Sequence, residues 1–285
     1  MADTLRHLRR QIKLVRNIRQ ITRAMQMVAA AKLRRVQQRV VEGRVYWQRM
    51  QDIVHDLSGV AHEVDHPLLR GRPVRRIGLL VVSSDKGLCG SYNAQIAREA
   101  ERFIGAQEAP VVVTLVGRKA RPTLERAGRT TAGQHTLEDR KLAEQALRVA
   151  RDLRRSYEVG EVDEVHVCYA RFASVSHDVP TVTRLIPVAP LAAKDAEPPS
   201  REYILEPPAA ELLGRLLPRY VDAQVYHMLL EAMASEHAAR MRAMAAATEN
   251  ADDMMTTLTM RANRLRQQEI TSALIDIVGG AEALR

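Results

Sequence analysis

Apolar side chains recur at a helical spacing along the first forty residues of the chain. From Leu5 to Val40 eleven apolar positions follow one another at a mean interval of about 3.5 residues, which is the period of a coiled coil. These positions are Leu5, Leu8, Ile12, Val15, Ile18, Ile21, Met25, Val28, Leu33, Val36 and Val40. The pattern predicts a long helix over residues 4–57 that carries one apolar seam.

A second seam lies near the carboxyl terminus. Its apolar positions are Ala251, Met255, Leu258, Ala262 and Leu265, followed by Ile270, Leu274 and Ile277. All 12 prolines lie between Pro67 and Pro218, and residues 219–278 contain neither proline nor glycine. Because proline breaks helix interiors, we predict a helix over residues 219–278. The chain goes out along one flank and returns along the other, so the simplest way to bury both seams is an antiparallel coiled coil of two helices.

The middle of the chain alternates between strand and helix patterns. Strands are predicted at Ile77–Val82, Val111–Val116, Glu164–Tyr169 and Thr181–Pro187. Helices are predicted over Tyr92–Ile104, with Ser91 as its cap, and from Thr136 to about Ser156. Strands that alternate with helices favour a mainly parallel sheet with covering helices. The predicted fold is therefore α/β, with a coiled-coil helix over residues 1–58, an α/β domain over 59–208 and a second coiled-coil helix over 209–285.

Charge is concentrated at the amino terminus. The chain of 285 residues has a net charge of +9, and its first 50 residues hold 13 lysines and arginines against 2 acidic residues. Such a segment indicates an acidic protein partner, nucleic acid or anionic lipid. The first residues lack the apolar core of a secretory signal, no aliphatic stretch is long enough to cross a bilayer, and two cysteines, Cys89 and Cys168, argue against a disulfide framework. These features favour the cytoplasmic side of a membrane.

One motif suggests a metal site. His62 to His66 reads H-E-x-x-H, the spacing that places two zinc ligands on one helix face with a glutamate as general base. Gly59 and Pro67 flank the motif, and the sequence offers no third ligand. We therefore favour a polar helix end that runs into a loop, and keep a zinc hydrolase as the weaker hypothesis.

Two further segments allow a chemical and a structural interpretation. Asp85 to Ser91 follows a strand and precedes a helix, where α/β sheets bind phosphate, but it matches no phosphate-loop motif, so we favour a structural turn. Cys89 could be a reactive thiol at that helix terminus. Arg70 to Arg76 is a basic run for which a solvated linker is the favoured interpretation over nucleic-acid binding.

Four motifs taken together resemble the gamma chain of bacterial F-type ATP synthases. They lie at Ile21–Leu33, Ser84–Gly90, Ala234–Met241 and Asn263–Ala281, and the resemblance extends from about residue 4 to 284. It implies a central rotor stalk, in which the coiled coil turns inside a ring of three alpha and three beta chains. The middle domain would be Rossmann-like and would sit with the epsilon chain on the membrane ring of c chains.

The resemblance also implies roles for particular residues. Arg266 and Gln267 match residues that hold a loop of the beta chain, and Met25 matches a position beside that chain's acidic lever. Glu202, Tyr203 and Glu206 resemble the foot that meets the c ring. The family's gamma chain has no catalytic residue, metal or cofactor, and reaches the inner membrane, on its cytoplasmic side, only through the c ring.

One alternative of another class stays open. A basic coiled coil could bind nucleic acid while its middle domain only spaces the helices. Thiol control of the kind found in chloroplast relatives is not expected, because residues 187–201 contain no cysteine pair.

Overall fold

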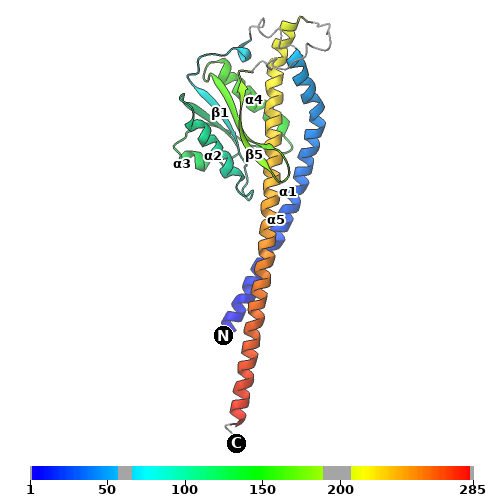
Figure 1. Cartoon of the computed structure of the whole chain (residues 1–285), viewed down its shortest axis with the longest axis vertical. Coiled ribbons are helices and arrows are strands. Elements are labelled where there is room, and N and C mark those ends of the chain that lie inside the picture. Colours follow the sequence, from blue (N-terminus) through cyan, green and yellow to red (C-terminus); the bar gives the residue numbers. More distant parts are fainter. Residues whose placement is uncertain (1, 57–65, 189–206, 283–285) are drawn as a thin grey trace. The chain divides into compact units, whose positions relative to one another are not determined.

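The computed structural model describes residues 2–56, 66–188 and 207–282, and the chain divides into two compact units. One unit consists of residues 1–30 and 240–285, and the other of residues 31–239. Two long helices, α1 (Ala2–Asp56) and α5 (Ala209–Glu282), each contribute residues to both units. The sheet and the short helices belong to the second unit (Figure 1).

A five-stranded sheet forms the centre of the second unit. Its strand order is β3-β2-β1-β4-β5, and all neighbours are parallel except β4 and β5. The strands are β1 (Ile77–Val82), β2 (Val111–Val116), β3 (Thr131–His135), β4 (Glu164–Phe172) and β5 (Asp178–Ile186). Every residue of β1 is buried, as expected of a central parallel strand covered on both faces. The prediction of a mainly parallel sheet is confirmed.

Both faces of strand β1 are covered, and alternate residues of the strand point to opposite faces. Leu79 and Val81 of β1 share one apolar core with α2 (Tyr92–Gly105) and α3 (Arg121–Arg126), through Ile96 and Leu124 among others. Leu80 and Val82 are equally buried, and successive strand residues point to opposite faces. Helix α4 (Leu142–Glu158) packs on β4 and on a short 3₁₀ helix, η2 (Pro67–Leu69).

Some predicted helix ends were wrong. Ser91 precedes α2 as predicted, but its side chain makes no capping hydrogen bond. Helix α4 begins at Leu142, six residues after Thr136, since residues 136–138 have no regular structure and residues 139–141 form a turn. Neither β3 nor α3 was predicted.

Helix α5 begins ten residues before the predicted start. It opens at Ala209 and contains Pro218, a residue that cannot donate the usual backbone hydrogen bond. Leu213, Leu217 and Val221 surround that proline at helical spacing and are at most 1% exposed. Burial of this apolar stripe offsets the missing hydrogen bond and lets the helix continue.

The first unit is an antiparallel helix pair. Its core contains Leu8 and Val15 of α1 and Ala251 and Leu258 of α5, as the two seams predict. Ile12, Met255, Ala262 and Leu265 pack around it. Further along, the hydroxyls of Thr22 and Thr248 lie 2.8 Å apart, and Arg19 forms an ion pair with Asp252 at 2.9 Å.

The seam of α1 differs in its middle from the predicted one. Its buried positions include a series with a spacing of seven residues, Leu8, Val15, Thr22, Ala29 and Val36, and also Leu33, as predicted. Ile18, Ile21 and Val28 are instead exposed by 45%, 60% and 57%, so their assignment to the seam was wrong. The seam includes a threonine and an alanine, which an apolar pattern does not distinguish from surface residues.

Candidate functional site

The carboxyl-terminal part of α5 exposes apolar side chains that its helix partner does not cover. Beyond Leu265 the exposed residues include Ile270, Leu274, Ile275, Ile277 and Val278, which are 54% to 68% exposed. Arg266 and Gln267 stand at the start of this segment and are exposed too. Since an exposed apolar surface of this kind favours association with another protein, this tip is the strongest candidate for a partner-binding surface.

Met25 lies in the same unit, on α1, and is partly buried. The next two residues of α1, Gln26 and Met27, line a groove of about 480 Å³ together with Met241 and Asp252 on α5, but Met25 itself is not among its lining residues. Met27 is 60% exposed. Methionine side chains adapt to irregular surfaces, so this groove suits contact with a moving or changing partner.

Several predicted site residues lie outside the described part of the chain. Glu202, Tyr203 and Glu206 fall within residues 189–206, and His62 and Glu63 fall within residues 57–65. His66 is described: its Nδ1 accepts a hydrogen bond from the backbone N–H of Leu68 at 3.2 Å, which caps η2, and burial lowers its pKa. Among the described residues there is no group of three or more potential metal ligands.

The loop after β1 uses its polar groups internally. The backbone N–H of Ser84 donates to Oδ1 of Asn93 at 3.0 Å, and Nδ2 of Asn93 lies 3.1 Å from the sulfur of Cys89. Cys89 is 2% exposed, so a reagent in solvent does not reach its thiol. This is the crevice where related α/β folds bind nucleotides, and here protein side chains satisfy the loop.

The basic run from Arg70 to Arg76 is partly folded into the domain rather than fully solvated. Arg72 lies over the ring of Tyr157, 4.5 Å from its centroid, and pairs with Asp163 at 2.6 Å. The backbone N–H groups of Arg75 and Arg76 also donate to the Asp163 carboxylate. The hydrogen bond from Arg75 is the largest cause that lowers the pKa of Asp163. The run therefore has a structural task in addition to its charge.

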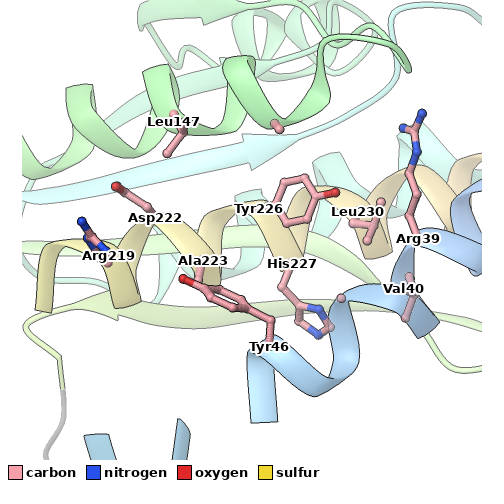
Figure 2. Close-up of a pocket in the computed structure, with 12 residues that line it drawn as sticks. Arg39, Val40, Tyr46, Leu147, Arg219, Asp222, Ala223, Tyr226, His227 and Leu230 are labelled. Carbon is pink, nitrogen blue, oxygen red and sulfur yellow. The ribbon is translucent and has the colours of Figure 1, made fainter. Parts of the chain in front are cut away.

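A second groove, of about 400 Å³, lies in the sheet-bearing unit (Figure 2). Helices α1, α4 and α5 line it, with Tyr46, Leu147 and Tyr226 among the apolar residues and Arg39 and Arg219 as cations. No sequence pattern indicated this groove, because its lining residues come from three separate elements.

Two polar residues of this groove, Asp222 and His227, have partners within the protein. Asp222 pairs with Arg154 at 2.9 Å, and burial raises the pKa of Asp222 although Arg154 opposes the effect. Burial lowers the pKa of His227, which lies 3.6 Å from Glu231. Asp222 and Arg154 thus form an ion pair at the edge of an apolar surface, an arrangement suited to binding rather than catalysis.

Asp139 is a site that sequence reasoning missed. Its carboxylate contacts Lys32 on α1 and His237 on α5. The interaction with the His237 imidazole, helped by Lys32, holds the pKa of Asp139 well below its usual range despite burial.

No helix in the described part of the chain is long and apolar enough to span a bilayer.

Comparison with known proteins identifies the relatives of this chain. A family model described as ATP synthase matches residues 4–284. The ATP synthase gamma chain of Desulfitobacterium hafniense is 42% identical over 280 residues and covers 98% of both chains. That of Heliobacterium modesticaldum is 39% identical over 287 residues, which are 98% of this chain and 99% of the relative.

Solved structures agree in fold. A chain from the central stalk and c ring of the Tetrahymena thermophila mitochondrial ATP synthase matches with a TM-score of 0.62 and 28% identity, over 80% of this chain and 99% of that chain. A chain from a Euglena gracilis mitochondrial ATP synthase matches with a TM-score of 0.70 over 100% of this chain and 95% of that chain, and its 18% identity makes this a likeness of fold alone. None of these matches supports the nucleic-acid alternative.

Proposed function

We propose that this chain, which belongs to the family of ATP synthase gamma chains, is the central rotor stalk of an F-type ATP synthase and couples proton flow through a c ring to ATP synthesis and hydrolysis. The observation that carries the proposal is the bare tip of α5. A helix that exposes Ile270, Leu274 and Ile277 needs an enclosing partner, and a ring of three alpha and three beta chains would supply one.

Rotation would act on the catalytic chains through differential contacts. A helix pair that turns inside a ring of three beta chains offers each of them a different face, so each is biased towards a different nucleotide-binding state. Arg266 and Gln267 would hold a loop of one beta chain, through charge and hydrogen bonds, and Met25 would contact the beta chain's acidic lever. All three side chains are at least partly accessible, which such contacts require.

A different segment of the chain would meet the membrane sector. We assign contact with the c ring to Glu202, Tyr203 and Glu206, and we propose that the epsilon chain binds the α/β domain. We also propose that the α/β domain that carries these contacts extends from residue 59 to residue 208. The chain would then lie at the cytoplasmic side of the cell inner membrane and be attached to it only through the c ring.

The chain itself would not catalyse the reaction. In the loop beyond β1 and at the start of α2, the polar groups of Ser84, Asn93 and Cys89 hydrogen-bond to one another. Binding of a nucleotide there would require breaking this network, because buried polar groups need their partners. Chemistry would therefore belong to the alpha and beta chains.

A reconstitution experiment tests the proposal. The chain is co-expressed with the alpha, beta and epsilon chains of its own organism, and ATP hydrolysis is measured for the wild type and for Arg266→Ala with Gln267→Ala. We expect a stoichiometric complex whose turnover falls on the order of tenfold in the double variant, since charge-assisted hydrogen bonds are lost.

A matched control separates this effect from general damage to α5. Arg261→Ala with Gln268→Ala removes the same two residue types, and positions seven residues apart share a helix face that is not the face of Arg266. This control should hydrolyse ATP at the wild-type rate. If the wild-type chain forms no complex at all, the rotor function is wrong, and if both double variants lose activity equally, the assigned contacts are wrong.

A further inference from the structure

A single aspartate contacts both long helices within the sheet-bearing unit. One carboxylate oxygen of Asp139, Oδ2, lies 2.9 Å from Nζ of Lys32 on α1. The other, Oδ1, lies 3.6 Å from Nε2 of His237 on α5. The backbone carbonyl of Asp139 accepts a hydrogen bond of 2.6 Å from Arg39, one heptad after Lys32 on α1. Asp139 therefore contacts α1 at two points, through its carboxylate and its backbone carbonyl, and α5 at one point, through its carboxylate.

The turn that carries Asp139 is itself fixed to the domain. The N–H of Leu137 donates to Oδ2 of Asp85, in the loop after β1, at 3.1 Å. The N–H of Glu138 donates to Oε1 of Gln145 on α4 at 2.8 Å, and Gln145 is 6% exposed. Both hydrogen bonds precede Asp139 directly, so its carboxylate is presented by a turn held from two elements of the domain.

The position of these contacts along the helices matters. The sheet-bearing unit contains residues 31–239, so Lys32 is its second residue and His237 is its third from last. Asp139 therefore contacts α1 and α5 at the place where each helix passes out of this unit. His237 is 4% exposed at its side chain, whereas Lys32 is 41% exposed. The contact on α5 is buried, and the contact on α1 is open to substitution without disturbing the core.

We propose that Asp139 is the positioning residue that transmits torque between the α/β domain and the paired helices of the rotor. This inference rests on the proposed rotor function. A domain turned by a membrane ring must pull both helices with it, and a contact at the exit of the unit acts on both at once. Ser235 and Tyr92 also hold α5 to the domain by buried hydrogen bonds, so loss of Asp139 would loosen the helices under load without detaching them, while the complex still hydrolysed ATP.

The test uses the complete synthase in sealed vesicles. Three variants are compared with the wild type: Asp139→Asn, Lys32→Met and the two combined. The ratio of proton uptake to ATP hydrolysed is measured, together with the hydrolysis rate after an uncoupler has removed the load. We expect unloaded hydrolysis at the wild-type rate and a ratio about two- to tenfold lower in Asp139→Asn. Lys32→Met should lower the ratio as well, and the combined variant should be no worse than Asp139→Asn, because both changes remove one interaction.

Glu138→Gln serves as the matched control. Glu138 precedes Asp139 and its side chain is exposed, 3.9 Å from Lys141 on the same turn. This variant changes the same charge one residue away and should keep the wild-type ratio. Thermal unfolding of the assembled complexes supplies a second readout. The unfolding temperatures of the Asp139→Asn and Glu138→Gln complexes should be too similar to explain the change in the ratio of protons to ATP.

The possible failures are distinct. If the wild type assembles and pumps but Asp139→Asn couples equally well, the torque-transmission proposal is overturned while the rotor function stands. A loss of ratio in Glu138→Gln of the same size would also overturn it, because the effect would then not be specific to this contact. If the wild-type chain forms no complex, the rotor function itself fails.

Discussion

Gly117 should tolerate no side chain, because the loop after β2 passes against the loop after β1. Its φ of +81° lies in the left-handed region that glycine adopts readily. A Cβ at this position would lie 2.2 Å from the carbonyl oxygen of Ser83 and 2.9 Å from the carbonyl carbon of Ser84. Both are backbone atoms, so no side chain can rotate away to make room. The substitution Gly117→Ala must therefore displace one loop from the other.

The size of the effect follows from the bonds that this displacement breaks. Relief of the contact needs a movement of more than about 1 Å, which exceeds what a hydrogen bond tolerates. The bonds at risk include the N–H of Gly117 to the carbonyl of His135 at 2.9 Å and the N–H of Ser83 to the carbonyl of Val116 at 2.8 Å. At about 1 kcal/mol for each of these two bonds, and about 1–2 kcal/mol for the left-handed conformation, we expect a loss of roughly 3–4 kcal/mol in the free energy of unfolding.

Gly128→Ala is the comparison that isolates the steric contribution. Gly128 has a similar φ of +73°, but a methyl group added there would have no atom within 4 Å, so this variant should lose only about 1–2 kcal/mol. Urea unfolding of the full chain gives the free energies, and hydrogen exchange of β1 and β2 amides shows whether the sheet is the part that opens. Equal losses for the two variants would refute the reasoning, because the close approach of the two loops would then carry no cost.

Two further predictions concern polar groups in the helices and the turn. The hydroxyls of Thr22 and Thr248 share two hydrogens among three contacts, since each also donates to a backbone carbonyl of its own helix. Replacement of both by valine should leave stability unchanged or raise it by about 1 kcal/mol, whereas either change alone should lower it, as thermal unfolding of the four chains would show. Asp139 has a lowered pKa in the folded chain, so its stabilisation is present above the usual aspartate value of 3.8 and is lost as the pH falls below it. The stability difference between wild type and Asp139→Asn should therefore narrow in acid, and a difference as wide at about pH 3 as at about pH 6 would contradict the assigned interaction.

The sheet could be predicted because its strands bear a strong local signal. Ile77–Val82 and Val111–Val116 were predicted with the boundaries that the structure has, since each is a continuous apolar run bounded by polar residues. β3 was missed for the opposite reason. Its residues, Thr131 to His135, are small or polar and only partly buried, because it is an edge strand. Nothing in its own composition distinguishes it from a loop, and its pairing with β2 decides its conformation.

The turn at Thr136 shows how a tertiary contact overrides a local signal. Thr136 followed by Asp139 has the spacing of a helix start, and an isolated peptide would be expected to begin its helix there. In the folded chain the carboxylate of Asp139 contacts Lys32 and His237, which are about a hundred residues away in each direction. Helix α4 therefore starts only at Leu142. The contact among Asp139, Lys32 and His237 could not be predicted from the sequence, because a local pattern does not indicate which distant segments come together.

The seam of α1 leads to a related conclusion about the partner-binding surface. Apolar periodicity alone places Ile18, Ile21 and Val28 inside the coiled coil, yet these side chains are exposed, and the seam is completed by Thr22 and Ala29. Small seam residues bring two helices close together, while the larger apolar ones remain available outside. The exposed isoleucines and valine on α1 thus need a binding partner that covers them, as do the exposed apolar residues at the tip of α5. A rotor that must touch several different chains in turn needs apolar surface outside its own seam, and a helix pair that buried every apolar residue would have none to offer.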